Sequence, residues 1–220
     1  ANYCVSPYLA RYSFFAKMPL IGNTTIINKT EEIYITENTA IEEAINKIDT
    51  CLVVAQVYKN NVLLNQGSGI ITTNDGLIMT TVDLAPVGNY QYKIITSSGK
   101  IFEGKVVGRD NDNNLALIDI EADNLQVVSW GELNNLRLGQ KIILIGAQIK
   151  QNYFYKFINT GTIRGFGQKT LAVNLDEFEL SANGGPLVNI KGEVIGLNIV
   201  GDKGLIKIIP VDILKDFLSL

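Results

Sequence analysis

The 220-residue chain is 46% hydrophobic and 19% charged, and it carries a formal net charge of −3. This weak negative charge excludes an electrostatic basis for nucleic-acid binding, and no apolar run reaches the roughly 18 residues that a membrane-spanning helix needs. Short runs of Val, Ile and Thr are split by Gly, Asn and Asp along most of the chain. This pattern is typical of an all-β protein with many short strands, and the length suffices for a large core.

Residues 1–36 lack the strand pattern, and we expect an N-terminal arm there. The segment 8–20 is aromatic and apolar, so the arm either binds a membrane or partner surface or packs on the chain's own domain. The two cysteines are Cys4 in the arm and Cys51 in the first predicted strand. They either form a disulfide or remain unpaired with Cys51 buried, and we favour unpaired thiols because spacing alone does not set connectivity.

A short helix is predicted over 40–48. Thr39 and Glu42 have the spacing of a capping box, which marks a helix start. Apolar residues then recur at helical spacing, at Ile41, Ala44, Ile45 and Ile48. We expect this apolar face to pack against the strands that follow.

Strands are predicted from residue 51 onward in two groups. The first group occupies 51–58, 67–71, 77–84, 92–96 and 101–107, with turn signals at Asn60-Asn61 and Asn74-Asp75-Gly76. The second group starts near residue 127 and occupies 142–146, 157–163, 171–175, 194–200 and 205–209. A loop with three aromatic residues is expected over 148–155, and a final helix over about 211–218.

One stretch carries a family resemblance. The run Ser181-Ala182-Asn183-Gly184-Gly185-Pro186-Leu187, followed by Gly192-Glu193-Val194-Ile195-Gly196, resembles the nucleophile loop and hairpin of trypsin-like serine proteases of the HtrA (Deg) type. Weaker matches occur in the family's order at Gly67-Ser68-Gly69 and at Leu115-Ala116-Leu117-Ile118. The resemblance covers about residues 40–220, and we expect no PDZ domain in this chain.

This resemblance implies a chymotrypsin/trypsin-like fold for a domain spanning 37–220. Such a fold consists of two six-stranded antiparallel β-barrels, here over about 50–122 and about 127–209. Short N-terminal and C-terminal helices accompany them.

The same resemblance assigns the family's catalytic positions. It implies that Asp83 occupies the histidine position, Asn114 the aspartate position and Asn183 the nucleophile position. Ser181 occupies the flexible glycine position of the oxyanion loop, where a side chain restricts the backbone. An amide cannot supply the attacking alkoxide, and the chain contains no histidine to act as a general base. We therefore expect a protease fold without catalytic residues.

The alternatives for these residues are Ser181 as a displaced nucleophile and Asp83 as a lone base acting on water. A calcium loop over 111–114 is disfavoured because the carboxylates are too few, and we expect no metal or cofactor. By the family's fold, Asp83, Asn114 and Asn183 should meet between the barrels, within roughly 3–4 Å or one water, as a polar plug if the site is closed. Asn114 is expected to be the direct donor to Asp83, with Asn183 farther away.

The function predicted from these residues is that of a pseudoprotease that works by binding. Protease clefts hold substrates as an added strand, and this edge can outlast the catalytic residues. The expected edge consists of Leu197, Asn198, Ile199 and Val200, beside the aromatic side chains of Tyr153, Phe154 and Tyr155. The partner would be an extended peptide or a protein, such as an active protease or an envelope protein.

Two alternatives to a binding protein are an active hydrolase with a non-standard site and a purely architectural envelope domain. By resemblance to membrane-anchored HtrA-like proteins, we expect an extracytoplasmic location and an anchor ahead of Ala1.

Overall fold

The computed structural model describes residues 37–175, 182–201 and 206–219. The predicted arm over 1–36, with Cys4, and the predicted oxyanion-loop residue Ser181 lie outside the described residues.

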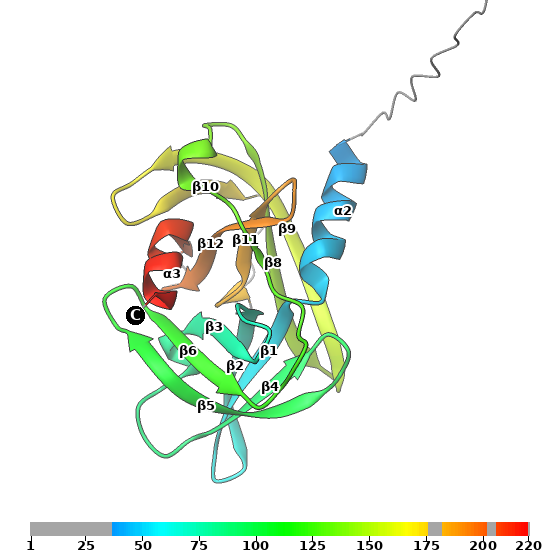
Figure 1. Ribbon diagram of the computed structural model, residues 1–220, viewed down its shortest axis with the longest axis vertical. Helices are drawn as coiled ribbons and strands as arrows, with labels where there is room; N and C mark the ends of the chain where they lie inside the picture. Colours follow the sequence, from blue (N-terminus) through cyan, green and yellow to red (C-terminus); the bar gives the residue numbers. More distant parts are fainter. Residues whose placement is uncertain (1–36, 176–181, 202–205, 220) are drawn as a thin grey trace, which may run out of the picture. The chain divides into compact units, whose positions relative to one another are not determined.

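Six antiparallel strands of the first half form a closed barrel, in the lower part of Figure 1. Their order is β1-β2-β3-β6-β5-β4, and β4 pairs with β1 to close the barrel. The strands are β1 (Leu52–Lys59), β2 (Val62–Ile71), β3 (Leu77–Thr81), β4 (Gln91–Thr96), β5 (Ile101–Asp110) and β6 (Leu115–Ile120). A 3-10 turn, η2 (Val82–Leu84), follows β3.

The second half forms another six-stranded barrel, in the order β11-β8-β9-β10-β13-β12, which the pairing of β11 with β12 closes. A two-residue strand, β7, also pairs with β12, in parallel. All other pairings in this barrel are antiparallel. The elements are β7 (Ser129–Trp130), η3 (Leu133–Asn135), β8 (Lys141–Lys150), β9 (Tyr153–Phe166), β10 (Leu171–Leu175), β11 (Pro186–Asn189), β12 (Glu193–Val200) and β13 (Ile206–Pro210). The predicted pair of six-stranded β-barrels is therefore confirmed.

The predicted aromatic loop over 148–155 is wrong, because this segment is the end of a long hairpin. β8 continues to Lys150, and β9 begins again at Tyr153. The two residues between them, Gln151 and Asn152, have φ values of 50° and 67°. Two successive left-handed residues make the tight turn that matches strand twist, so the chain needs no wider loop here.

Among the described residues, two helices flank the barrels, α2 (Glu37–Asp49) and α3 (Val211–Leu218). α2 starts before the predicted residue 40, so Thr39 lies within the helix and is not its cap. Threonine is only a moderately poor helix former, and burial of Ala44 and Ile48 holds this helix against the barrels. Within the described residues, neither helix has the length and apolarity to cross a bilayer.

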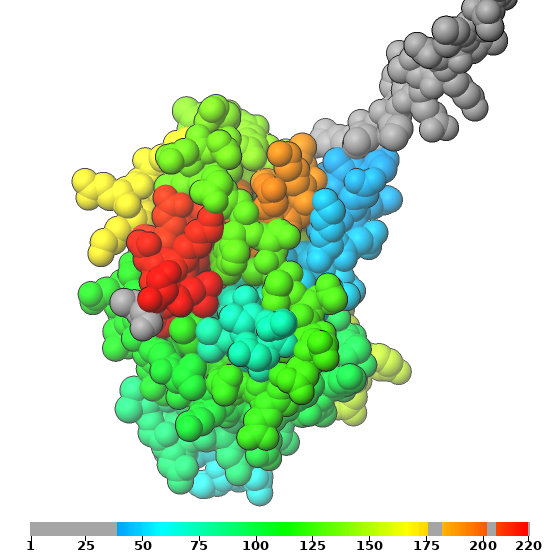
Figure 2. Space-filling view, in the orientation of Figure 1, coloured from blue at the N-terminus to red at the C-terminus, as the bar shows by residue number. Residues whose placement is uncertain are grey.

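The largest apolar cluster joins both barrels and both helices. Ile70 of β2 and Val188 of β11 contribute to it from the two barrels, Ile48 from α2 and Leu214 from α3. Each barrel also has an interior cluster of its own. Figure 2 shows the two helices on either side of the molecule, with segments of both barrels between them. The shared cluster holds the two barrels together, so side chains from both can meet at a fixed site.

Candidate functional site

Asp83 lies in the 3-10 turn η2, directly after β3. The flanking Leu84 and Ala85 are fully buried in the first barrel, so this short turn leaves the Asp83 side chain at the surface. Asp83 is exposed, which contradicts a closed plug with a buried carboxylate. An exposed carboxylate remains solvated, so Asp83 does not need the amide donors to offset a cost of burial.

Side chains behind the turn hold its backbone in place. Arg109 donates from Nε to the carbonyl of Ala85 at 2.6 Å and from Nη2 to that of Pro86 at 3.0 Å. The Tyr92 hydroxyl donates to the same Pro86 carbonyl at 2.7 Å. Burial raises the pKa of the Tyr92 phenol, although the nearby Arg109 opposes this effect, so the phenol remains a donor at neutral pH.

The loop after β5 is organised by the carboxylate of Asp110. Its Oδ1 accepts from the backbone N–H groups of Asp112 at 3.0 Å and Asn113 at 3.1 Å, and its Oδ2 accepts from the Asn113 side chain at 2.6 Å. Desolvation raises the pKa of Asp110, but these hydrogen bonds outweigh it and the net pKa is lowered. The ionised carboxylate therefore stabilises the turn that presents the next residue, Asn114.

Asn114 faces Asp83 from a left-handed backbone conformation, with φ of 55°, which Asn tolerates better than most residues. Its Oδ1 accepts from the backbone N–H of Val82 at 3.1 Å. Its Nδ2 donates to Asp83 Oδ2 at 3.3 Å. Both halves of this amide therefore bind the turn that carries Asp83.

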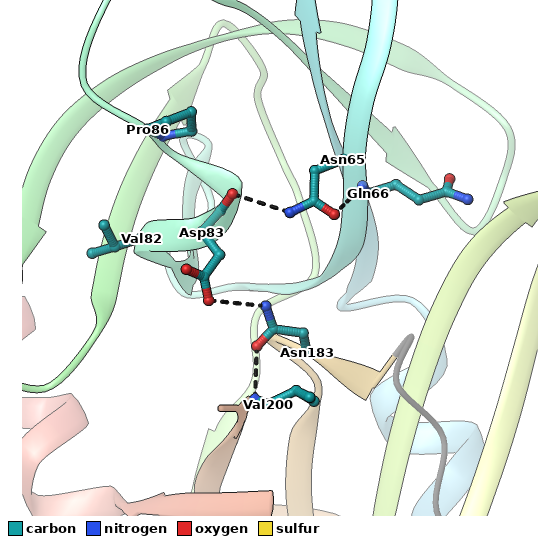
Figure 3. Close-up of a pocket in the computed structure, with 7 residues that line it drawn as sticks. All are labelled: Asn65, Gln66, Val82, Asp83, Pro86, Asn183 and Val200. Atoms are coloured by element: carbon teal, nitrogen blue, oxygen red, sulfur yellow. Dashed lines mark hydrogen bonds between the residues drawn. The ribbon is translucent and has the colours of Figure 1, made fainter. Parts of the chain in front are cut away.

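Asn183 reaches the same carboxylate from the second barrel. Its Nδ2 lies 3.4 Å from Asp83 Oδ2 and 3.1 Å from Thr81 Oγ1. Its Oδ1 accepts from the backbone N–H of Val200, at the end of β12, at 3.0 Å (Figure 3). Its backbone carbonyl accepts from the N–H of Ser68 in β2 at 2.8 Å.

The backbone next to Asn183 requires glycine. Gly184 has φ of 79°, and a Cβ there would lie 2.1 Å from the Ser68 carbonyl oxygen. Its N–H donates to the Asn198 carbonyl at 2.8 Å. This close packing against β2 and β12 positions Asn183 between the barrels.

The structure thus brings Asp83, Asn114 and Asn183 within hydrogen-bonding distance, as the sequence predicts. The expectation that Asn183 stands farther off is wrong, since the two amide nitrogens lie 3.3 and 3.4 Å from the same oxygen. Gly184 allows Asn183 to pack close to β2.

A hollow of about 560 Å³ opens beside these side chains. Asp83 is its sole ionisable lining residue among those described, and the Asn65 side chain at its edge donates to the Asp83 carbonyl at 3.2 Å (Figure 3). The hollow is lined by Asn65, Gln66, Val82, Asp83, Pro86, Asn183 and Val200. Such a surface can accept and donate hydrogen bonds. Its described lining residues include no nucleophile, and the Thr81 hydroxyl beneath it is buried.

The predicted peptide edge is wrong in its first half. Leu197 pairs with β11 on one side and β13 on the other. The N–H and C=O of Asn198 bond the backbone of Gly185 and Gly184, both at 2.8 Å. The backbone groups of Leu197 and Asn198 are therefore used in closing the barrel. Ile199 and Val200 lie beyond the part of β12 that pairs with β11.

The aromatic side chains do not line the hollow beside Asp83. Tyr153 and Tyr155 are exposed on the β8–β9 hairpin. Phe154 is half-buried and lines a separate hollow of about 480 Å³, together with Tyr58 and Leu63 of the first barrel. The prediction that they flank the peptide edge is therefore wrong, because the hairpin extends toward the first barrel.

Cys51 is a buried, unpaired thiol, and burial raises its pKa. The favoured interpretation of two unpaired cysteines stays a prediction, because Cys4 lies outside the described residues. The part of the chain that the structure describes contains no group of three or more candidate metal ligands.

Sequence reasoning missed Thr81, Asn65 and Asp110. Thr81 and Asn65 carry no motif, and their contacts depend on strand packing that the sequence does not specify. Asp110 could have been found from the sequence. An Asp side chain often accepts from the backbone N–H groups two and three residues later, which here are those of Asp112 and Asn113.

Comparisons with known proteins agree with this fold. A family model described as a trypsin-like peptidase domain matches residues 67–197. "Serine protease HTRA4" of Mus musculus is 31% identical, over 81% of this chain and 40% of its own length. "Serine protease HTRA1B" of Danio rerio is 30% identical, over 81% of this chain and 40% of its own length.

A bacterial relative extends this set. "Probable periplasmic serine endoprotease DegP-like" of Halomonas elongata is 29% identical, over 68% of this chain and 34% of its own length. The chain spans less than half the length of each of these three relatives.

Proposed function

The chain belongs to the trypsin-like peptidase family of the HtrA/Deg type, and we propose that it is a catalytically inactive member that works by binding. The bound partner is an extended peptide or protein segment. The role of this chain is that of a scaffold or a regulatory subunit.

One observation carries the proposal of inactivity. The side chains that converge between the barrels are those of Asp83, Asn114 and Asn183, a carboxylate held by two amides. Peptide hydrolysis by the family's mechanism needs a nucleophile, a base that takes its proton and a group that orients the base. An amide is neither a nucleophile nor a general base, and the chain has no histidine to take a proton.

Binding is supported by the shape and chemistry that surround these side chains. The hollow beside Asp83 measures about 560 Å³ and offers acceptors and donors from Asp83, Asn183 and Asn65. Beside it, Ile199 and Val200 end β12 beyond its pairing with β11. A strand end next to a polar hollow suits a segment that adds main-chain hydrogen bonds to a sheet.

An extracytoplasmic location is part of the same proposal. It is supported by the name of the Halomonas elongata relative, which describes that protein as periplasmic. Partners in that setting would be envelope proteins or an active protease of the same family.

Binding without cleavage is tested with one probe, fluorescently labelled, reduced and carboxymethylated casein. We expect saturable binding by fluorescence anisotropy and no new casein fragments by mass spectrometry after prolonged incubation. Fragments that no longer form with Ser181→Ala would identify an active hydrolase with a displaced nucleophile. Neither binding nor cleavage would favour an architectural domain.

A further inference from the structure

The Asn183 side chain bonds the end of β12 on the side where β11 stops, while β13 pairs with the other side. Its Oδ1 accepts from the Val200 N–H at 3.0 Å, and its Nδ2 donates to Thr81 Oγ1 at 3.1 Å. The pairing of β12 with β11 ends at Leu197 and Pro186, so Asn183 bonds β12 beyond the point where its neighbouring strand stops.

A carboxamide has the same hydrogen-bonding groups as a peptide unit, one carbonyl acceptor and N–H donors. Asn183 therefore presents to Val200 the same acceptor that an added strand would present. On its other side, it offers an N–H donor to the Asp83 carboxylate at 3.4 Å. Asn183 is half-buried and lines the hollow, so solvent and ligand can reach its side chain.

We propose that the Asn183 side chain is an internal occupant of the peptide site, and that an extended peptide binds by displacing it. The peptide's carbonyl takes over the Val200 N–H, and a main-chain N–H of the peptide replaces the amide donor to Asp83. This inference rests on the proposed function, since it specifies how the bound segment enters that site.

Asn114 provides a matched control. It is also half-buried and donates to the same Asp83 oxygen, at 3.3 Å. Its side-chain carbonyl, however, accepts from Val82 within its own barrel, at 3.1 Å, instead of from Val200. Removing either amide takes one donor from Asp83. Of the two changes, the loss of the Asn183 amide alone also removes the acceptor of the Val200 N–H.

The first readout needs no ligand. Hydrogen exchange of the Val200 amide, followed by NMR, should be about threefold to tenfold faster in Asn183→Ala, because one hydrogen bond is lost. Asn114→Ala should leave this exchange rate unchanged. Thr81→Val removes the acceptor at the other end of the Asn183 amide and should accelerate exchange by a smaller factor. Unchanged exchange in a folded Asn183→Ala protein overturns the inference.

The second readout is the affinity for reduced, carboxymethylated casein. Asn183→Ala should bind it about threefold to tenfold more tightly than the unmodified chain, whereas Asn114→Ala, which keeps the Asn183 side chain in place, should show no gain in affinity. Equal binding by all three proteins overturns the displacement and leaves the proposed function standing. Binding by none of them overturns both.

Discussion

Asn114 and Asn183 donate to one oxygen of Asp83 from the two barrels, but their side-chain carbonyls accept from different backbone N–H groups. The Asn114 carbonyl binds Val82, next to Asp83 itself, so this amide closes a contact within the first barrel. The side-chain carbonyl of Asn183 accepts from the Val200 N–H, so this amide links the first barrel to the end of β12. The comparison shows that Asn114 supports the turn that carries Asp83, whereas Asn183 also holds the end of β12.

The largest expected effect comes from restoring the family's residues on both sides. The triple variant Asp83→His, Asn114→Asp and Asn183→Ser rebuilds the three catalytic side chains, and we expect little casein hydrolysis from it. Adding Ser181→Gly should raise the rate by about 10²-fold, since removal of one oxyanion-hole donor costs proteases at least that much. Full activity of the triple variant would show that Ser181 does not distort the loop.

Gly184→Ala tests how rigidly the second barrel positions Asn183. A Cβ there would lie 2.1 Å from the Ser68 carbonyl oxygen at φ of 79°, so we expect the free energy of unfolding to fall by about 3 kcal/mol. Gly139→Ala is the control, because Gly139 has φ of 77° and no heavy atom within 4 Å of its Cβ position. Its loss should be about 1 kcal/mol, from backbone strain alone. Equal losses in urea denaturation would contradict close packing at Gly184.

Asp110→Asn tests the support of Asn114 in the first barrel. The carboxylate accepts three hydrogen bonds but is partly solvated, so we expect a loss of about 1 kcal/mol at pH 7. Folding lowers the pKa of Asp110 below its ordinary value of 3.8, so its ionised form stabilises the fold above that pH. The stability difference from the unmodified chain should vanish as the pH falls through the lowered pKa.

Asp112→Asn is the control for that pH profile. Asp112 is exposed and contributes its backbone N–H, not its carboxylate, to the turn. Its stability should match that of the unmodified chain at pH 7. A stability difference for Asp110→Asn that persists unchanged at pH 2 would contradict the role assigned to the charge.

The sequence predicts the two barrels and the meeting of Asp83, Asn114 and Asn183, because its motifs resemble those of the HtrA/Deg family and that family's fold brings these positions together. It does not predict that Asp83 is exposed, since exposure depends on how η2 turns after β3. It also misjudges the peptide edge, because the residues that close a barrel use backbone groups that no sequence motif marks. The hairpin at Gln151 and Asn152 was missed since left-handed turns need not contain glycine.

Fluorophosphonate labelling of the unmodified chain tests inactivity most directly, since these probes react with activated serine nucleophiles. The chain has no histidine, and two amides converge on Asp83 at the candidate site, so we expect no covalent adduct by mass spectrometry under conditions in which trypsin is fully labelled. An adduct on the unmodified chain that is lost in Ser181→Ala would contradict it and identify Ser181 as an active nucleophile.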